Sequence, residues 1–220
     1  MLRLAVLSIG LALSTTFAVA SDPAPGGAYK TDPSHSSFNW SFNHSGLSHY
    51  TARFTKVDAR LDWKPEKPEA STLSVTIDPL SVRTDYPWPE KVDFDAEIGG
   101  DETFLAAKPI TFVSKTIRVT GEKIGTVDGL LTFRGETHPV TLDVTFNGSM
   151  AEHPMMGVPK IGFSATGSIR RSEWGLDFAI PELGDEVTWP SKRRWSLPTT
   201  SSRDPRGRGT FDDHPIKNFD

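Results

Sequence analysis

Apolar and polar residues alternate with a period of two in several short segments of this 220-residue chain. In the first of them, Phe38, Trp40 and Phe42 alternate with polar residues. The same pattern recurs in residues 59–63, 73–77, 140–146 and 161–165. A period of two places successive side chains on opposite faces of a β-strand, so each segment has one apolar face. The chain is therefore predicted to be all-β, either a closed barrel or two stacked sheets, because both arrangements hide those faces from water.

Turn-forming residues separate these segments, at 64–68 (KPEKP) and 134–137 (RGET). Their spacing is typical of an antiparallel sheet. One stretch breaks the pattern, because in residues 90–98 Phe94 and Ile98 are four residues apart and acidic residues lie opposite them. That spacing predicts one short helix, acting either as a lid or as a plain connection.

The N-terminus has the layout of a secretory signal peptide. Arg3 supplies a positive charge, residues 4–13 are largely apolar, and Ala18-Val19-Ala20 offers small side chains for cleavage after Ala20. About ten apolar residues are too few for a transmembrane helix, which needs about 20. We therefore predict that residues 1–20 are removed and that the mature protein is exported and does not span a membrane.

Composition narrows the classes of function. Without residues 1–20 the chain carries 23 basic and 28 acidic side chains, a net charge of −5 that argues against nucleic-acid binding. No cysteine is present, which excludes disulfides, thiol catalysis and cysteine-based metal sites. The G-x-S-x-G and H-E-x-x-H motifs, a glycine-rich phosphate loop and histidine pairs at metal-ligand spacing are all missing. We therefore expect no enzyme, no cofactor and no metal, with a lipid hydrolase using His35 or His44 as a weaker alternative.

Three motifs in order resemble the YceI-like proteins over about residues 29–187. Residues 29–38 (YKTDPSHSSF), followed by Trp40, Phe42, His44 and Phe54, are similar to the family's first hairpin. Residues 129–140 (GLLTFRGETHPV) are similar to its G-x-L-T-x-x-G-x-T-x-x-V hairpin. Residues 163–176 (FSATGSIRRSEWGL) are similar to its late F-x-A-x-G-x-I-x-R-S-x-F-G-L segment.

The resemblance implies a lipocalin-like antiparallel β-barrel of about eight strands with one short helix. It also implies an apolar cavity for one polyisoprenoid or other long-chain lipid, and a carrier or sequestering role in the periplasm. A barrel of that size is wide enough either to fill itself with side chains or to hold one slender ligand. A β-sandwich interaction module without lipid remains the alternative, and the oligomeric state, a homodimer included, is left open.

The candidate ligand-binding residues are the inward aromatic residues and three polar ones: Phe38, Trp40, Phe42, His44, Phe54, Phe94, Phe112, Phe133, Phe163, His35 and Arg171. For the aromatic residues the alternative is an ordinary filled core. His35 and His44 either meet a polar lipid head or fix the hairpin through backbone hydrogen bonds. Arg171 either grips a phosphate or carboxylate or forms a structural ion pair.

The C-terminal segment, residues 189–220, differs in character from the predicted domain at 21–188. It carries four prolines and a net charge of +3, against −8 for residues 21–188, and no alternation follows Thr188. We interpret it as a disordered basic segment or as the product of a frameshift that replaced the closing strand. Translation of the gene in its other two frames tests the frameshift hypothesis, which requires an alternating strand after Val187 in one of them.

Overall fold

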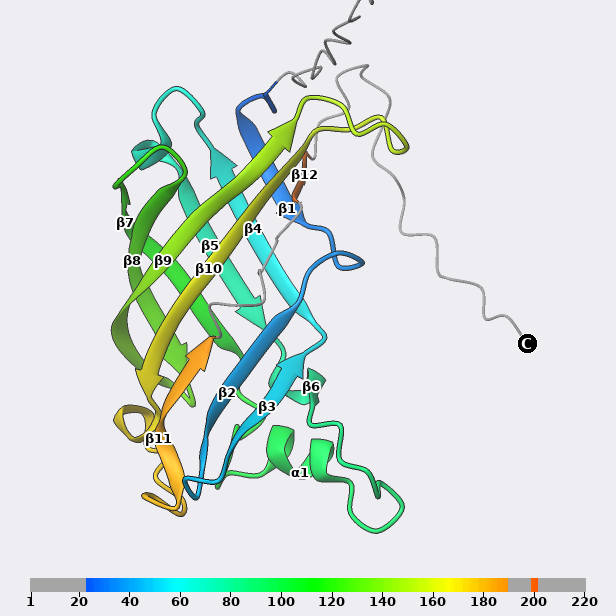
Figure 1. Ribbon diagram of the computed structural model, residues 1–220, viewed down its shortest axis with the longest axis vertical. Coiled ribbons are helices and arrows are strands. Elements are labelled where there is room, and N and C mark those ends of the chain that lie inside the picture. The colour runs from blue at the N-terminus through cyan, green and yellow to red at the C-terminus, as the bar shows by residue number, and fades with distance from the viewer. Residues whose placement is uncertain (1–22, 190–198, 202–220) are drawn as a thin grey trace, which may run out of the picture.

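A computed structural model describes residues 23–189 and 199–201, and Figure 1 shows their arrangement. The predicted signal peptide and most of the C-terminal segment lie outside the described residues. The strands are β1 (Gly27–Thr31), β2 (Phe38–His44), β3 (Ser48–Phe54), β4 (Val57–Trp63), β5 (Thr72–Ile77), β6 (Val82–Arg83), β7 (Ile110–Val119), β8 (Ile124–Phe133), β9 (Glu136–Met150), β10 (Lys160–Arg170), β11 (Leu183–Trp189) and β12 (Thr199–Ser201). In this described part of the chain, one α-helix, α1 (Phe94–Gly100), and three 3₁₀ turns, η1 (Pro68–Ala70), η2 (Pro79–Ser81) and η3 (Arg171–Trp174), connect the strands.

The strands form a single curled antiparallel sheet. Its order is β12-β1-β4-β5-β7-β8-β9-β10-β11-β2-β3-β6, and β12 also pairs with β10, so that the sheet curls round on itself (Figure 1). The prediction of an all-β antiparallel fold is confirmed, and one curled sheet replaces the alternative of two stacked sheets. The prediction of about eight strands is wrong, because the sheet contains twelve strands among the described residues alone. Two of them, β6 and β12, have only two and three residues and leave no periodic pattern in the sequence.

The curl has local causes in the long strands. The register shifts between Ser114 and Thr116 in β7 and between Gly162 and Phe163 in β10. Such bulges increase the local twist and bend of a strand. β10 is long enough to pair with β12 at its start and with β11 at its end. It therefore connects the β12–β1 side of the sheet with the β11–β2 side.

The predicted turn at 134–137 is a tight hairpin between β8 and β9. Phe133 pairs with Glu136, and the two turn residues Arg134 and Gly135 have φ of 53° and 92°. Two positive φ angles suit the right-handed twist of the strands that such a turn connects. The Arg134 guanidinium donates to the carbonyls of Trp174, Glu102 and Phe104, which ties this hairpin to the loops beside it.

The predicted helix exists but is shorter than residues 90–98 suggested. It begins at Phe94, because the Asp93 carboxylate accepts a hydrogen bond from the Ala96 amide at 3.0 Å and caps the first turn. It ends at Gly99 and Gly100. Within the described residues, no helix has the length and apolarity that crossing a bilayer requires.

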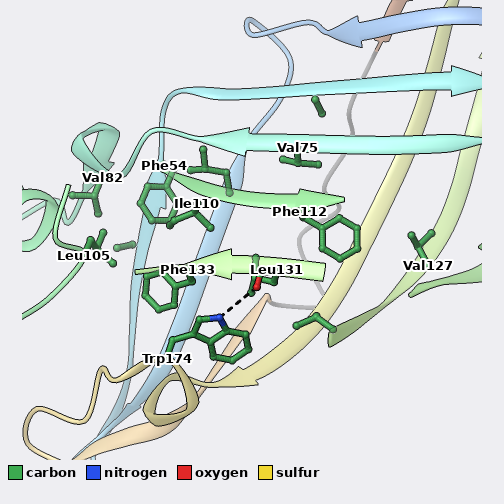
Figure 2. Packing of buried hydrophobic residues seen from close by; sticks show 14 residues of the cluster. Phe54, Val75, Val82, Leu105, Ile110, Phe112, Val127, Leu131, Phe133 and Trp174 are labelled. Carbon is green, nitrogen blue, oxygen red and sulfur yellow. Dashed lines mark hydrogen bonds between the residues drawn. The ribbon is translucent and has the colours of Figure 1, made fainter. Parts of the chain in front are cut away.

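The tightly packed core lies against the wall formed by β5, β7 and β8. Phe112, Leu131 and Phe133 are each 6% exposed, and Trp174 packs beside them with 1% exposed (Figure 2). The Trp174 indole donates to the Leu131 carbonyl at 3.4 Å, so this buried N–H has an acceptor. Full burial of side chains of this size contributes about 1.5–3 kcal/mol each to folding.

A buried ion pair reinforces the place where the sheet closes. β12 lies between β1 and β10, with Thr199 paired to Thr31 on one side and to Ile161 on the other. Across it, the Lys160 ammonium reaches the Asp32 carboxylate at 2.5 Å, and both side chains are more than nine-tenths buried. Burial alone would raise the pKa of Asp32, but hydrogen bonds from Lys160, Ser34 and His35 hold that pKa well below its usual 3.8.

This ion pair predicts an acid-sensitive component of stability. Because the pKa of Asp32 is lower in the folded than in the unfolded state, its contribution is complete above about pH 4 and is lost as the pH falls further. We expect the difference in unfolding free energy between wild type and Asp32→Asn to shrink below pH 4. Urea titrations at pH 6, 4, 3 and 2 measure it, and a difference that stays constant over that range would contradict the assignment.

Candidate functional site

An apolar cavity of about 760 Å³ runs inside the curled sheet. Its wall comes from β2–β5 and β7–β11, with α1 and the loops around η3 at one end and the β7–β8 hairpin at the other. This volume is in the upper part of the range for small-molecule sites. The side chains that form most of its wall are aliphatic or aromatic.

Aromatic rings line the cavity along β2 and β3. Trp40 stacks on Phe42 with ring centroids 6.1 Å apart, and Tyr50 lies 5.4 Å from Phe42. These rings are half-buried, and all three border the cavity. Burial raises the pKa of the Tyr50 phenol, so the group stays neutral at physiological pH.

A second aromatic cluster lines the cavity towards the β7–β8 hairpin. Trp63 of β4 stacks on Phe146 of β9 at 6.2 Å, and Phe163 of β10 lies 5.5 Å from Trp63. The charged residues among the lining at this end, Arg118 and Lys123 included, are exposed. The cavity is thus aromatic towards both ends, with the aliphatic and phenylalanine side chains of β5, β7 and β8 between them.

Ten of the eleven predicted ligand-binding residues border this cavity. They are Phe38, Trp40, Phe42, His44, Phe54, Phe94, Phe112, Phe133, Phe163 and Arg171. His44 stands at the rim, because its side chain is exposed near the tip of the β2–β3 hairpin. These ten predicted residues therefore lie around one cavity inside the sheet.

His35 is the predicted residue that does not border the cavity. It lies on the exposed turn between β1 and β2, where its Nδ1 is 3.0 Å from an Asp32 carboxylate oxygen. The Ser34 hydroxyl approaches the same ring nitrogen, at 3.3 Å. A hydrolytic relay needs the serine and the carboxylate on different ring nitrogens, so this cluster is not arranged as one.

Arg171 borders the cavity, but its guanidinium is occupied by the protein's own backbone. It donates to the carbonyls of Leu176, Phe178, Leu183 and Gly184 at 2.7–3.0 Å. The side chain is 6% exposed. The geometry therefore favours a structural role, holding the loop after η3 in place, over contact with a charged ligand.

Six aromatic residues that border the cavity were not among the predicted site residues: Tyr50, Trp63, Phe104, Phe146, Phe178 and Trp189. Tyr50 alternates with Ala52 and Phe54 in β3, and Trp63 ends an alternating segment, so both had a usable signal. Trp189 was assigned to the C-terminal segment, although it is the last residue of β11 and pairs with Gly167.

Comparison with known proteins agrees with this architecture. Residues 29–189 match the model of the YceI-like domain. The chain belongs to the YceI-like family.

Relatives of this YceI-like protein include a UPF0312 protein of Pseudomonas fluorescens, 33% identical over 178 residues that cover 79% of this chain and 86% of the relative. Among solved structures, Burkholderia cenocepacia BcnA has a TM-score of 0.62 at 21% identity, covering 78% of this chain and 99% of BcnA. A polyisoprenoid binding domain from Saccharophagus degradans has a TM-score of 0.52 at 12% identity, covering 79% and 97%. At these identities the two structures show that the YceI-like fold is shared.

Proposed function

We propose that this protein holds one long apolar chain, isoprenoid or acyl, in its cavity and acts as a periplasmic carrier or sequestering protein. The observation that carries the proposal is the apolar cavity itself. Each ligand methylene moved from water into such a site contributes about 0.8 kcal/mol, so a long chain binds tightly without any charged contact. The proposed role is binding, with no catalytic step.

Two further observations support parts of the proposal. The layout of residues 1–20 supports export, and the aqueous periplasm is a compartment that free apolar chains do not cross unaided. The ligand named for the Saccharophagus degradans domain, a polyisoprenoid, makes isoprenoids the first probes to try.

A substitution that fills the cavity tests the proposal. Ala165 borders the cavity from the middle of β10 and is only half-buried, which leaves room for a larger side chain. We expect Ala165→Trp to exclude several methylenes of a bound chain. Loss of four methylenes weakens binding by about 3 kcal/mol, more than a hundred-fold in Kd. Native mass spectrometry of the purified protein, alone and with added isoprenoid or fatty acid, measures the bound fraction.

Ser168→Trp is the matched control, because Ser168 lies on the same strand with an exposed side chain that does not border this cavity. This variant should bind as the wild type does. The proposal fails if the wild type neither co-purifies with a lipid nor takes up the added chains. It also fails if both tryptophan variants bind equally well.

A further inference from the structure

Exposed aromatic side chains gather at one end of the curled sheet. Among the described residues, three aromatic side chains are exposed: Tyr86 at 36%, Trp88 at 50% and Phe178 at 48%. Tyr86 and Trp88 lie in the loop before α1, and Phe178 lies in the loop before β11. Both loops are at the lower end of the sheet in Figure 1, whereas the β9–β10 hairpin is at its upper end. Singly exposed apolar residues are normal on a protein surface, but these three share one end.

The turn between β2 and β3 adds a further apolar side chain at the same end (Figure 1). Leu47 in this turn is 90% exposed. The Ser45 amide donates to the Glu182 carbonyl at 2.7 Å, which fixes the turn beside the loop that carries Phe178. Three separate segments thus present exposed apolar side chains at this end of the sheet. We call these segments the apolar rim: residues 45–47, 84–93 and 176–182.

The loop before α1 holds Trp88 in a defined position. Pro87 and Pro89 flank this residue and restrict the backbone on both sides of it. Tyr86 packs beside Trp88 with ring centroids 5.7 Å apart, and the Lys91 ammonium lies 5.3 Å from the centre of the Trp88 ring. Because this half-exposed side chain is already ordered, its burial against a partner loses little further entropy.

The apolar rim is continuous with the wall of the cavity. Phe94 of α1 borders the cavity, and its ring centroid lies 5.5 Å from that of Tyr86. Phe178 borders the cavity itself, and its ring centroid lies 5.5 Å from that of Phe104, another lining residue. Aromatic contacts therefore connect the lining with the exposed loops in two places. An apolar chain that enters or leaves at this end stays beside apolar side chains.

We propose that the apolar rim docks on the surface of a lipid bilayer whose headgroups carry no net charge. Tryptophan and tyrosine favour the boundary between headgroups and hydrocarbon, because one part of each side chain is apolar and the other stays in contact with water. Docking places the α1 end of the cavity against the bilayer, where a bound chain exchanges with the membrane. The exchange rests on the proposed function, but the docking does not require an occupied cavity.

The charge of the rim favours uncharged headgroups over anionic ones. Its three segments contain a single basic residue, Lys91. They contain five acidic residues, all exposed: Asp85, Glu90, Asp93, Asp177 and Glu182. Anionic lipids give a membrane a negative surface potential, which repels a rim of this charge.

The competing partner for the rim is another protein. A protein interface has a closely packed apolar core that excludes water. The exposed apolar side chains of the rim stand instead on three separate loops that also carry carboxylates. A fluid lipid surface accommodates such an arrangement without matching its shape, so the observations favour the membrane.

Flotation of the full mature chain with phosphatidylcholine vesicles tests the docking. We expect Leu47→Ser and Trp88→Ser each to weaken vesicle binding by about three- to ten-fold, because each variant loses the burial of one exposed apolar side chain. Neither residue borders the cavity, so both variants should take up added chains as the wild type does. Met155→Ser is the matched control, because Met155 is 92% exposed on the β9–β10 hairpin at the opposite end. Its binding to vesicles should equal that of the wild type.

Vesicles with added phosphatidylglycerol test the choice of headgroup. The double variant Glu90→Gln/Glu182→Gln should bind these anionic vesicles more tightly than the wild type does, because the membrane no longer repels two of the carboxylates. It should bind phosphatidylcholine vesicles as tightly as the wild type. If the double variant and the wild type bind anionic vesicles equally well, the rim does not face the headgroups.

The outcomes separate membrane docking from chain binding. Ala165→Trp narrows the cavity without changing the rim, so it should float with vesicles as the wild type does. Docking through the rim is wrong if Met155→Ser weakens binding as much as Leu47→Ser does. It is also wrong if the wild type does not float with either kind of vesicle, which leaves a protein partner for these loops. Neither result affects the chain-binding cavity, whereas a wild type that floats but takes up no chain refutes the proposed function and keeps the docking surface.

Discussion

Replacing Lys160 by methionine is expected to lower the free energy of unfolding by about 3–5 kcal/mol. The substitution keeps the length of the side chain but leaves the Asp32 carboxylate buried without its cation, at 6% exposure. Such a loss is a large fraction of the stability of an ordinary domain. Urea unfolding at pH 7, followed by circular dichroism, measures the change.

Two further variants make this test specific. Lys64→Met removes a lysine from the Lys64–Asp62 pair, whose side chains are about half exposed, and should cost no more than about 1 kcal/mol. Adding Asp32→Asn to Lys160→Met removes the uncompensated charge and should recover part of the loss. If Lys160→Met proves no less stable than Lys64→Met, the ion pair does not support the closure of the sheet.

Replacing Arg171 by methionine is expected to have a comparable effect, a loss of about 3–5 kcal/mol, for a different reason. The guanidinium is the common donor to four carbonyls between Leu176 and Gly184, and methionine leaves all four without it. Arg171→Lys should recover little of the loss, because a single ammonium does not reproduce the planar fork of donors. Urea unfolding measures the loss of overall stability, and hydrogen exchange of residues 176–184 measures the loosening of the loop itself.

Arg170→Met is the matched control, since Arg170 is the preceding residue and is exposed. It should change stability by less than about 0.5 kcal/mol and leave exchange in residues 176–184 unaltered. The structural role assigned to Arg171 is refuted if its methionine variant keeps wild-type exchange rates in that loop. In that event a direct contact with ligand becomes the better explanation of Arg171.

The period-two pattern predicted most of the wall because it reports directly which face of a strand is apolar. Phe38, Trp40 and Phe42 were assigned inward by that pattern, and all three border the cavity. The pattern does not reach strands of two or three residues, which explains why β6 and β12 were not foreseen. It also does not give the start of α1, which Asp93 fixes through a side-chain cap.

The polar candidates show a different limit of the sequence. An arginine that grips a phosphate and one that grips backbone carbonyls use the same donors, so residue type alone does not separate the two roles of Arg171. His35 belongs to a family motif but lies outside the alternating segments, so the sequence did not show which way it faces. The structure places it on the exposed turn that follows β1. Trp189 was hidden by the change in composition that starts at that position, although its backbone continues β11.

The pairing of β1 also has a consequence for the order of events while the chain is made. β1 pairs with β4, which follows it closely, and with β12, which brings Tyr29 opposite Ser201. One edge of β1 therefore stays unpaired until residues 199–201, near the end of the domain, are available. An open strand edge is a template for pairing with other chains, and contacts between distant residues form slowly. A sheet that still lacks residues 199–201 thus leaves an edge of β1 open to pairing with another chain.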